Sequence, residues 1–556
     1  MKMKNKYYLI IVAILGVIAF FAGAYLQSQS SNPITKEIVA SAEKIFGLSF
    51  SNAKRDSMLS GLTEQLKSYE SLRQISLPNE IPPAIGFNPI PVGFQFEKKK
   101  KSFKLGKLGR VELPNDENEL AFYSVAQLAK LIKSKKISSE DLTKLYINRL
   151  KKYSPKLECV ITLTESLAVE QARRADREIM LGKYRGHLHG IPYGAKDLLA
   201  TKGIKTTWGS VPYKNQIIDQ DATVIRKLEE AGAVLVAKLT MGELAWGDVW
   251  FDGKTRNPWN TVEGSSGSSA GAASATSAGL VAFAIGTETW GSIISPSTVC
   301  GVSGLRPTYG RVSRNGAMAL SWSMDKIGPI CRTAEDCAIV FNSIYGPDGI
   351  DQSVFDYPFS YDANVKLSDL KIGYLKVEFD SIKENKNIYN QTLETLRSLG
   401  ANLVPMSLPK YPVNELSFIL SAEAGAAFDE LTRNGQDDLL VRQIKDAWPN
   451  VFRLSRFIPA VEYIQANRHR FVLIQEMEKI FEEVDCYIAP PFEGDNLLLT
   501  NLTGHPCVVT PNGFSKSGMP TSITFIGKLF DEGTILTVAK QYQDATDYHH
   551  KHPKIK

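Results

Sequence analysis

The sequence predicts an α/β fold whose single large domain has a mixed, mostly parallel twisted sheet covered by helices on both sides. Helical segments alternate with short apolar runs; residues 223–231, for example, have helical spacing and precede the apolar run 232–237. This alternation is typical of sheets whose strands are joined by helical crossovers. The composition of the 556 residues, 43% hydrophobic and 22% charged, is ordinary for a folded protein with a large core.

The first 26 residues predict a membrane-targeting segment. A basic start, Met1–Lys6, is followed by Tyr7–Leu26, a charge-free run about as long as a bilayer-spanning helix. Because lysine and arginine favour the cytoplasmic side, the rest of the chain should be exported and be membrane-anchored, periplasmic or extracellular. Ala22–Ala24 matches a signal-peptidase pattern. We favour a retained signal anchor, and a cleaved signal peptide stays open.

Residues 27–115 are predicted to be a spacer with some helical content. Five prolines interrupt any long helix, and a run of four lysines, Lys98–Lys101, follows them. We interpret the lysines as a solvated loop rather than a membrane contact, because an exported segment does not face the acidic cytoplasmic leaflet.

From residue 117 onward, helix signals are clear. Ser124 with Gln127, and Ser138 with Asp141, have the spacing of capping residues before apolar positions at helical intervals. Further along we expect a strand at 370–375, a helix at 460–481, two strands within 501–527 and a helix at 531–543. The folded domain therefore spans residues 116–556.

Composition argues against several classes of function. A net charge of +6 is mild for this length, so nucleic-acid binding is not expected. The six cysteines include no C-x-x-C pair, and we interpret them as small buried residues rather than zinc ligands. His549, His550 and His552 are interpreted as surface histidines. No metal or other cofactor is expected, and the sequence leaves the oligomeric state open.

A run of glycine, serine and alanine, Gly264–Gly271, is the most informative local feature. It leads toward the apolar stretch Leu280–Ile285, so it is unlike a flexible linker, and Gly286–Ser292 follows directly. Small residues allow close backbone approach around a reacting group. Earlier in the chain, Lys196 ends an apolar segment; burial of a lysine lowers its pKa, so that the neutral amine can act as a base.

These segments together resemble the amidase signature family. The resemblance rests on Lys196, Ser268 and Ser292, supported by Cys300–Ser313 and Asn501–Pro506, and extends from about residue 117 to 553. It implies a core signature at 185–330 and a variable substrate-pocket region at about 350–500. Aligning the Gly/Ser run by Gly279 and Gly286 makes Ser268, rather than Ser265 or Ser266, the first serine of the family's serine pair.

The resemblance implies a Ser-cisSer-Lys triad. Ser292 would attack the amide carbonyl, Ser268 would relay the proton, and neutral Lys196 would be the base. The peptide bond that precedes Ser268 would be cis. Backbone N–H groups would stabilise the oxyanion, namely those of Thr289, Trp290, Gly291 and Ser292. The implied substrate is a small-molecule or peptide linear amide, cleaved to release ammonia or an amine.

The sequence departs from the family pattern around this triad. Trp290 replaces a usual glycine, Ile294 an arginine and Glu288 an aspartate, while Ser266 and Ala270 replace glycines. We expect Trp290 to narrow the pocket. Losing the arginine beside a longer acid predicts a rearranged ion pair near Ser292.

The sequence thus predicts an exported amide hydrolase and leaves two alternatives open. A glutamine-hydrolysing amidotransferase subunit would share the motifs, but Tyr7–Leu26 argues against it because such chemistry uses cytoplasmic RNA and ATP. A catalytically inactive binding protein on the same fold is suggested by Trp290 and Ile294.

Overall fold

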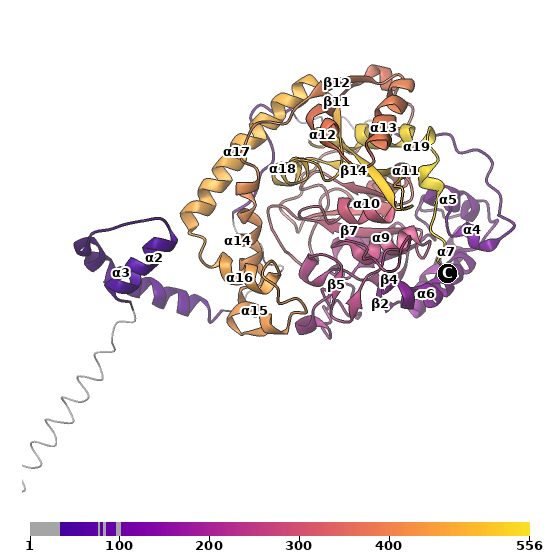
Figure 1. Ribbon diagram of the computed structural model, residues 1–556. Helices are drawn as coiled ribbons and strands as arrows, with labels where there is room; N and C mark the ends of the chain where they lie inside the picture. Colours follow the sequence, from indigo (N-terminus) through magenta and orange to yellow (C-terminus); the bar gives the residue numbers. More distant parts are fainter. Residues whose placement is uncertain (1–33, 76–77, 80, 82–84, 96–101, 556) are drawn as a thin grey trace, which may run out of the picture. The chain divides into compact units, whose positions relative to one another are not determined.

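A computed structural model describes residues 34–75, 78–79, 81, 85–95 and 102–555 (Figure 1). The predicted targeting segment Tyr7–Leu26 and the lysine run Lys98–Lys101 lie outside these residues. Within the described ranges, no helix is both long and apolar enough to cross a membrane.

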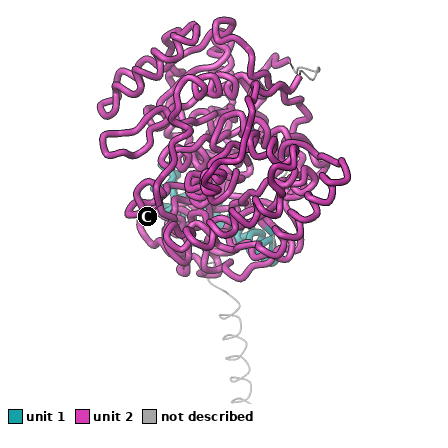
Figure 2. Tube along the Cα trace, turned by 90° about the vertical axis from the view of Figure 1, so that its right-hand side faces the viewer, with its two compact units in different colours: residues 1–78 teal, residues 79–556 magenta. Residues whose placement is uncertain are grey.

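The chain divides into two compact units, residues 1–78 and 79–556 (Figure 2). In the first, helices α2 (Lys36–Ile45) and α3 (Asn52–Leu72) are joined by an ion pair, in which Arg55 donates to the buried carboxylate of Glu43 at 2.8 Å. The second unit begins at Asn79, inside the segment that we expected to be a spacer. Residues 79–115 therefore belong to the same unit as the predicted catalytic domain.

An eleven-stranded sheet forms the centre of the second unit. In order across the sheet, its strands are β12 (Asn402–Met406), β11 (Lys371–Leu375), β13 (Cys486–Ala489), β15 (Pro520–Gly527), β14 (Cys507–Phe514), β8 (Ser303–Arg306), β9 (Lys326–Cys331), β7 (Phe283–Glu288), β3 (Pro192–Lys196), β4 (Val234–Leu239) and β2 (Val160–Leu163). Short two-stranded pairs accompany it, β1 (Phe103–Lys104) with β10 (Tyr361–Asp362) and β5 (Val249–Trp250) with β6 (Gly253–Lys254).

The sheet is mixed, as predicted, but the expectation of a mostly parallel sheet is wrong. Of its ten neighbouring pairs, four are parallel and six are antiparallel. Helical crossovers through α8 (Thr223–Glu230) and α13 (Lys386–Ser398) make β3–β4 and β11–β12 parallel. Direct turns, such as the one joining β14 to β15, make their strands antiparallel.

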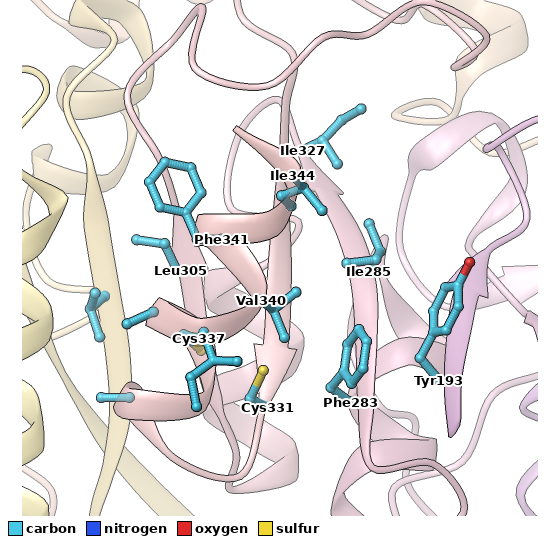
Figure 3. Close-up of a cluster of buried hydrophobic side chains, with 14 of the residues drawn as sticks. Tyr193, Phe283, Ile285, Leu305, Ile327, Cys331, Cys337, Val340, Phe341 and Ile344 are labelled. Carbon is cyan, nitrogen blue, oxygen red and sulfur yellow. The ribbon is translucent and has the colours of Figure 1, made fainter. Parts of the chain in front are cut away.

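Both faces of the sheet are buried. Phe283 and Ile285 of β7 pack into one hydrophobic cluster with α11 (Ala334–Ile344) and α19 (Glu532–Asp544), whereas Ala284 between them packs into another with α9 (Ala270–Ser277). Figure 3 shows side chains of the first cluster from β7, β9 and α11. Because side chains alternate along a strand, this pattern confirms helices on both sides.

The remaining helices follow the predicted signals. Ser124 caps α5 (Val125–Lys133) in a capping box with Gln127, and Ser138 caps α6 (Ser139–Leu157), as expected. The helix expected at 460–481 is α17 (Ala460–Glu483), along one edge of the unit in Figure 1. The other α-helices are α4 (Glu117–Leu120), α7 (Glu165–Met180), α10 (Ile294–Cys300), α12 (Lys376–Ser381), α14 (Phe418–Ala427), α15 (Asp429–Arg433), α16 (Trp448–Ser455) and α18 (Asn496–Thr503).

Candidate active site

The predicted site residues meet where two parallel strands end. Strand β3 ends at Lys196 and its parallel neighbour β7 ends at Glu288. Carboxyl ends of parallel neighbours lie at one edge of a sheet, which is where α/β proteins commonly place their sites. Lys196 and Thr287, 91 positions apart in sequence, are thereby brought into hydrogen-bonding contact.

Lys196 is fully buried and hydrogen-bonded to neutral groups. Its Nζ lies 2.8 Å from Ser268 Oγ, 2.8 Å from Thr287 Oγ1 and 3.2 Å from Ser269 Oγ. Burial lowers the pKa of Lys196 to about 7, with Asp325 and Glu288 only partly opposing the shift. Near neutral pH a large fraction of the amine is therefore unprotonated and able to accept a proton.

Ser268 lies between Lys196 and the start of α9. The peptide bond Gly267–Ser268 is cis, as the family resemblance implies, and Ser268 is buried. A Cβ on residue 267 would stand 1.7 Å from the carbonyl oxygen of Gly247, so the close passage of these two backbones requires glycine there. The alignment of the Gly/Ser run that selects Ser268, rather than Ser265 or Ser266, agrees with the contact between Ser268 and Lys196.

Ser269, which the sequence analysis did not assign a role, ties the serine pair to β7. Its Oγ accepts from the backbone N–H of Thr287 at 3.1 Å and donates to the carbonyl of Thr287 at 3.0 Å. Ser269 and Thr287 both contact Lys196 as well. The sequence could have identified Ser269 and Thr287 only by their position next to the predicted motif residues.

Ser292 lies against the same serine pair. The backbone N–H of Ser269 donates to the carbonyl of Ser292 at 3.1 Å, and the Ser292 residue is 8% exposed. Gly291 before it has φ of +85°, a left-handed conformation that suits glycine. The structure thus places all three predicted triad residues in one neighbourhood, with Lys196 and Ser268 in direct contact and Ser292 joined to them through Ser269.

The segment from Thr289 to Ser292 presents backbone donors. Among the described residues, none accepts a hydrogen bond from the N–H groups of Trp290, Gly291 or Ser292. These N–H groups are therefore available to a ligand oxygen. Trp290 itself is 42% exposed and is not among the residues that line the cavity described below, so the narrowing of the pocket by its side chain stays a prediction.

Glu288 forms the rearranged ion pair that the sequence predicts. Its buried carboxylate lies 2.9 Å from Arg306 of β8, and also accepts from the backbone N–H of Ile293 and Ile294 at 2.8 and 2.9 Å. Burial disfavours ionisation, but Arg306, the Ile294 N–H and Asn501 outweigh it and keep the pKa of Glu288 below its ordinary value. Glu288 thus anchors the start of α10, immediately after Ser292.

A cavity of about 660 Å³ reaches the site at Thr287 and Thr289. Asp325, also in its wall, accepts from Thr289 Oγ1 at 2.5 Å and from the backbone N–H groups of Leu320 and Ser321. Burial raises the pKa of Asp325. Nothing in the sequence pattern identified Asp325, because the strand pairing of β9 with β7 brings it there.

The histidines near the C-terminus differ from expectation at one position. His549 is buried, and burial lowers its pKa to about 3, so its interpretation as a surface histidine is wrong. Across the described ranges, no group of three or more histidine, cysteine, aspartate or glutamate side chains could hold a metal ion. The six cysteines are buried free thiols, which confirms their interpretation.

Comparisons with known proteins agree with this geometry. The family model described as Amidase matches residues 141–536. A glutamyl-tRNA(Gln) amidotransferase subunit of Carboxydothermus hydrogenoformans is 33% identical, over 79% of this chain and 100% of that protein. A protein of the same name from Acinetobacter baumannii is 35% identical, over 78% of this chain and 98% of its own length. The structure of peptide amidase from Stenotrophomonas maltophilia is similar with a TM-score of 0.70 and 27% identity, over 78% of this chain and 98% of that one.

Proposed function

Because this chain belongs to the amidase family, we propose that it cleaves the carbon–nitrogen bond of an amide through an acyl-enzyme on Ser292. One observation carries the proposal: a fully buried amine, Lys196, with a pKa of about 7, lies 2.8 Å from the hydroxyl of Ser268. A neutral amine beside a serine is the base that a serine nucleophile needs.

The proposed reaction transfers the acyl group of the amide first to Ser292 and then to water. As Ser292 Oγ bonds to the amide carbon, its proton passes to Ser268 Oγ, while the proton of Ser268 passes to Lys196. The same route in reverse gives a proton to the departing nitrogen, which leaves as ammonia or an amine. Water then loses a proton along this path, attacks the ester, and releases the acid and Ser292.

The oxyanion of each tetrahedral intermediate is proposed to bind the N–H groups of Thr289, Trp290, Gly291 and Ser292. Loss of one such donor typically costs about 3–4 kcal/mol of transition-state stabilisation. Backbone donors tolerate the change from glycine to tryptophan at residue 290, since the N–H group is the same in both residues and the Trp290 side chain is 42% exposed.

Two substrate classes are candidates. The sequence relatives favour our alternative, a glutamine-hydrolysing subunit that works with partners, because those relatives, 33% and 35% identical, carry an amidotransferase name. The expected free hydrolase of linear amides has weaker support, from the 27% identity to peptide amidase. Ammonia release from glutamine, compared with release from a panel of linear amides by the purified chain, separates the two.

Export and membrane anchoring remain proposals that rest on Tyr7–Leu26. Cell fractionation with a protease-accessibility assay tests them. Recovery of the full chain from the cytosol with a second subunit would favour the amidotransferase.

Acyl-enzyme formation is tested with a serine-directed fluorophosphonate and mass spectrometry. We expect a single adduct on Ser292, lost in Ser292→Ala. Absence of an adduct, together with no ammonia or amine release from any amide, would favour the inactive binding protein.

A further inference from the structure

A segment before the family match contributes to the cavity wall. We call residues 85–95 the strap; the Amidase match begins at residue 141. Phe87 of the strap packs edge-on against Tyr309, with ring centroids 5.0 Å apart, and the guanidinium of Arg470 lies 3.5 Å from the centre of the Phe87 ring. Further on, the backbone N–H of Val92 donates to Gln475 Oε1 at 3.0 Å. The strap is therefore fixed to the unit by contacts along its length.

The chain is also attached just before the strap. The side chain of Asn79 donates to the carbonyl of Ala319 at 3.0 Å and accepts from its N–H at 2.6 Å. Ala319 lies in the cavity wall. This two-point contact holds residue 79 beside the same wall that the strap reaches.

Four strap residues, Ile85 to Asn88, line the cavity that reaches Thr287 and Thr289. Thr287 bonds directly to Lys196, and Thr289 belongs to the proposed oxyanion segment. Lys196, Ser268 and Ser292 are not among the cavity's lining residues, but a group bound in it would lie between their neighbours Thr287 and Thr289 and the strap. Such a group is the acyl part of an amide or its leaving amine.

The cavity wall offers apolar contacts. Its large apolar members include Leu198, Met318, Leu320, Trp322, Ile327 and Ile350, and Phe87 adds a ring from the strap. A volume of about 660 Å³ lies within the roughly 300–1,000 Å³ of pockets that hold organic ligands. The space suits a group such as a phenylalkyl chain.

The charged side chains in the wall are already engaged within the protein. Arg314 lies 3.6 Å from Asp351 and donates to Ser353 Oγ at 2.9 Å, and Asp325 accepts the three hydrogen bonds given above. Burial lowers the pKa of Lys326 well below its ordinary value, and its amine donates to the Met324 carbonyl. Free glutamine carries an ammonium and a carboxylate, whose burial here would lack dedicated counter-charges.

We propose that the strap forms the outer wall of a substrate-binding cavity and that this cavity selects amides with an apolar alkyl or aryl group. The inference rests on the proposed amide hydrolysis and names its substrate class. It assigns Ile85 and Phe87, which both line the cavity, as specificity-determining residues.

The test compares two matched strap positions. Ile85 lines the cavity and Val92 does not, yet their exposed fractions are 79% and 77%. In the full chain carrying Ser292→Ala, calorimetry should detect binding of 4-phenylbutyramide and none of glutamine. Ile85→Asp should weaken that binding about tenfold, because the bound chain would desolvate a new carboxylate. Val92→Asp should leave it unchanged, and both exposed substitutions should preserve the melting temperature.

Equal binding by the Ile85→Asp and Val92→Asp proteins, absence of 4-phenylbutyramide binding, or preferential binding of glutamine would overturn the strap proposal. Failure of the underlying function has a different signature. In that case the phenyl amide binds and responds to Ile85→Asp, but protein with an intact Ser292 releases no ammonia from it.

Discussion

Two buried lysines on neighbouring strands of this sheet have opposite surroundings. Lys196 ends β3. Lys238 lies on β4, where it is paired in register with Ala195 of β3, and both lysine side chains are fully buried. Lys238 lies 2.9 Å from the carboxylate of Asp197, whereas Lys196 contacts hydroxyl groups and a carbonyl. One is a cation held in an ion pair, and the other is an amine whose pKa falls to about 7.

Strand geometry explains how neighbours come to differ so much. Side chains alternate across a strand, so Asp197, the residue after Lys196, points to the face of Lys238 and away from Lys196. Asp197 is further held by Thr207, whose N–H and hydroxyl donate to it at 2.7 and 2.5 Å. The nearest carboxylate in sequence is thereby committed elsewhere, which leaves Lys196 free to act as a base.

The largest expected effect is on catalysis at Lys196. Lys196→Met should lower kcat by about 10²–10⁴-fold or more, since general-base catalysis contributes that range. The melting temperature should change little, because an amine that is costly to bury is replaced by an apolar chain of similar length. Steady-state kinetics and thermal unfolding check this; retained turnover would remove Lys196 from the mechanism.

The matched substitution at Lys238 should lower stability, whereas the one at Lys196 lowers turnover. Lys238→Met leaves the carboxylate of Asp197 buried without its cation, and breaking a buried ion pair typically costs about 3–5 kcal/mol. Urea unfolding should show that loss. A double variant, Lys238→Met with Asp197→Leu, should recover much of the stability; if Lys238→Met alone is as stable as the wild type, the proposed division of roles is wrong.

The pH profile sharpens the comparison. Only the neutral amine accepts a proton, so kcat/KM should rise with pH about tenfold per unit below pH 7 and level off above it, following the pKa of about 7 of Lys196. Measurements with a neutral amide between pH 5 and 9 test this. A flat profile across pH 7 would contradict Lys196 as the titrating base.

Sequence motifs located the residues to which we assign the reaction, but not their partners. Lys196, Ser268 and Ser292 each lie in a recognisable local pattern, and the register chosen from Gly279 and Gly286 selected the serine that contacts Lys196. Contacts made across the sheet could not be predicted, because they depend on strand order. The bonds from Thr287 to Lys196 and from Glu288 to Arg306 are of this kind.

The same limit explains the errors in the fold. Periodicity identified the strands and helices, yet the proportion of parallel pairs depends on which distant strands meet, as β14 meets β8. The prolines of the expected spacer did not exclude a long helix from it, because the 21-residue helix α3 (Asn52–Leu72) lies before them. They gave no sign that residues 85–95 pack against the rest of the second unit, because those contacts are made with residues such as Tyr309 and Gln475, far along the chain.

The smallest expected effects come from two threonines that bond these lysines. Thr287 Oγ1 lies 2.8 Å from Lys196 and Thr206 Oγ1 lies 3.0 Å from Lys238. Thr287→Val removes an acceptor that favours the ammonium form, so the inflection of the pH profile should move below its wild-type position with little change in stability. Thr206→Val should leave the profile unchanged and cost about 1.5 kcal/mol of unfolding free energy, the lower range for a hydrogen bond to a charged group. If both substitutions affected only stability, the two lysine sites would be equivalent in kind, and the distinction between a base and a structural cation would fail.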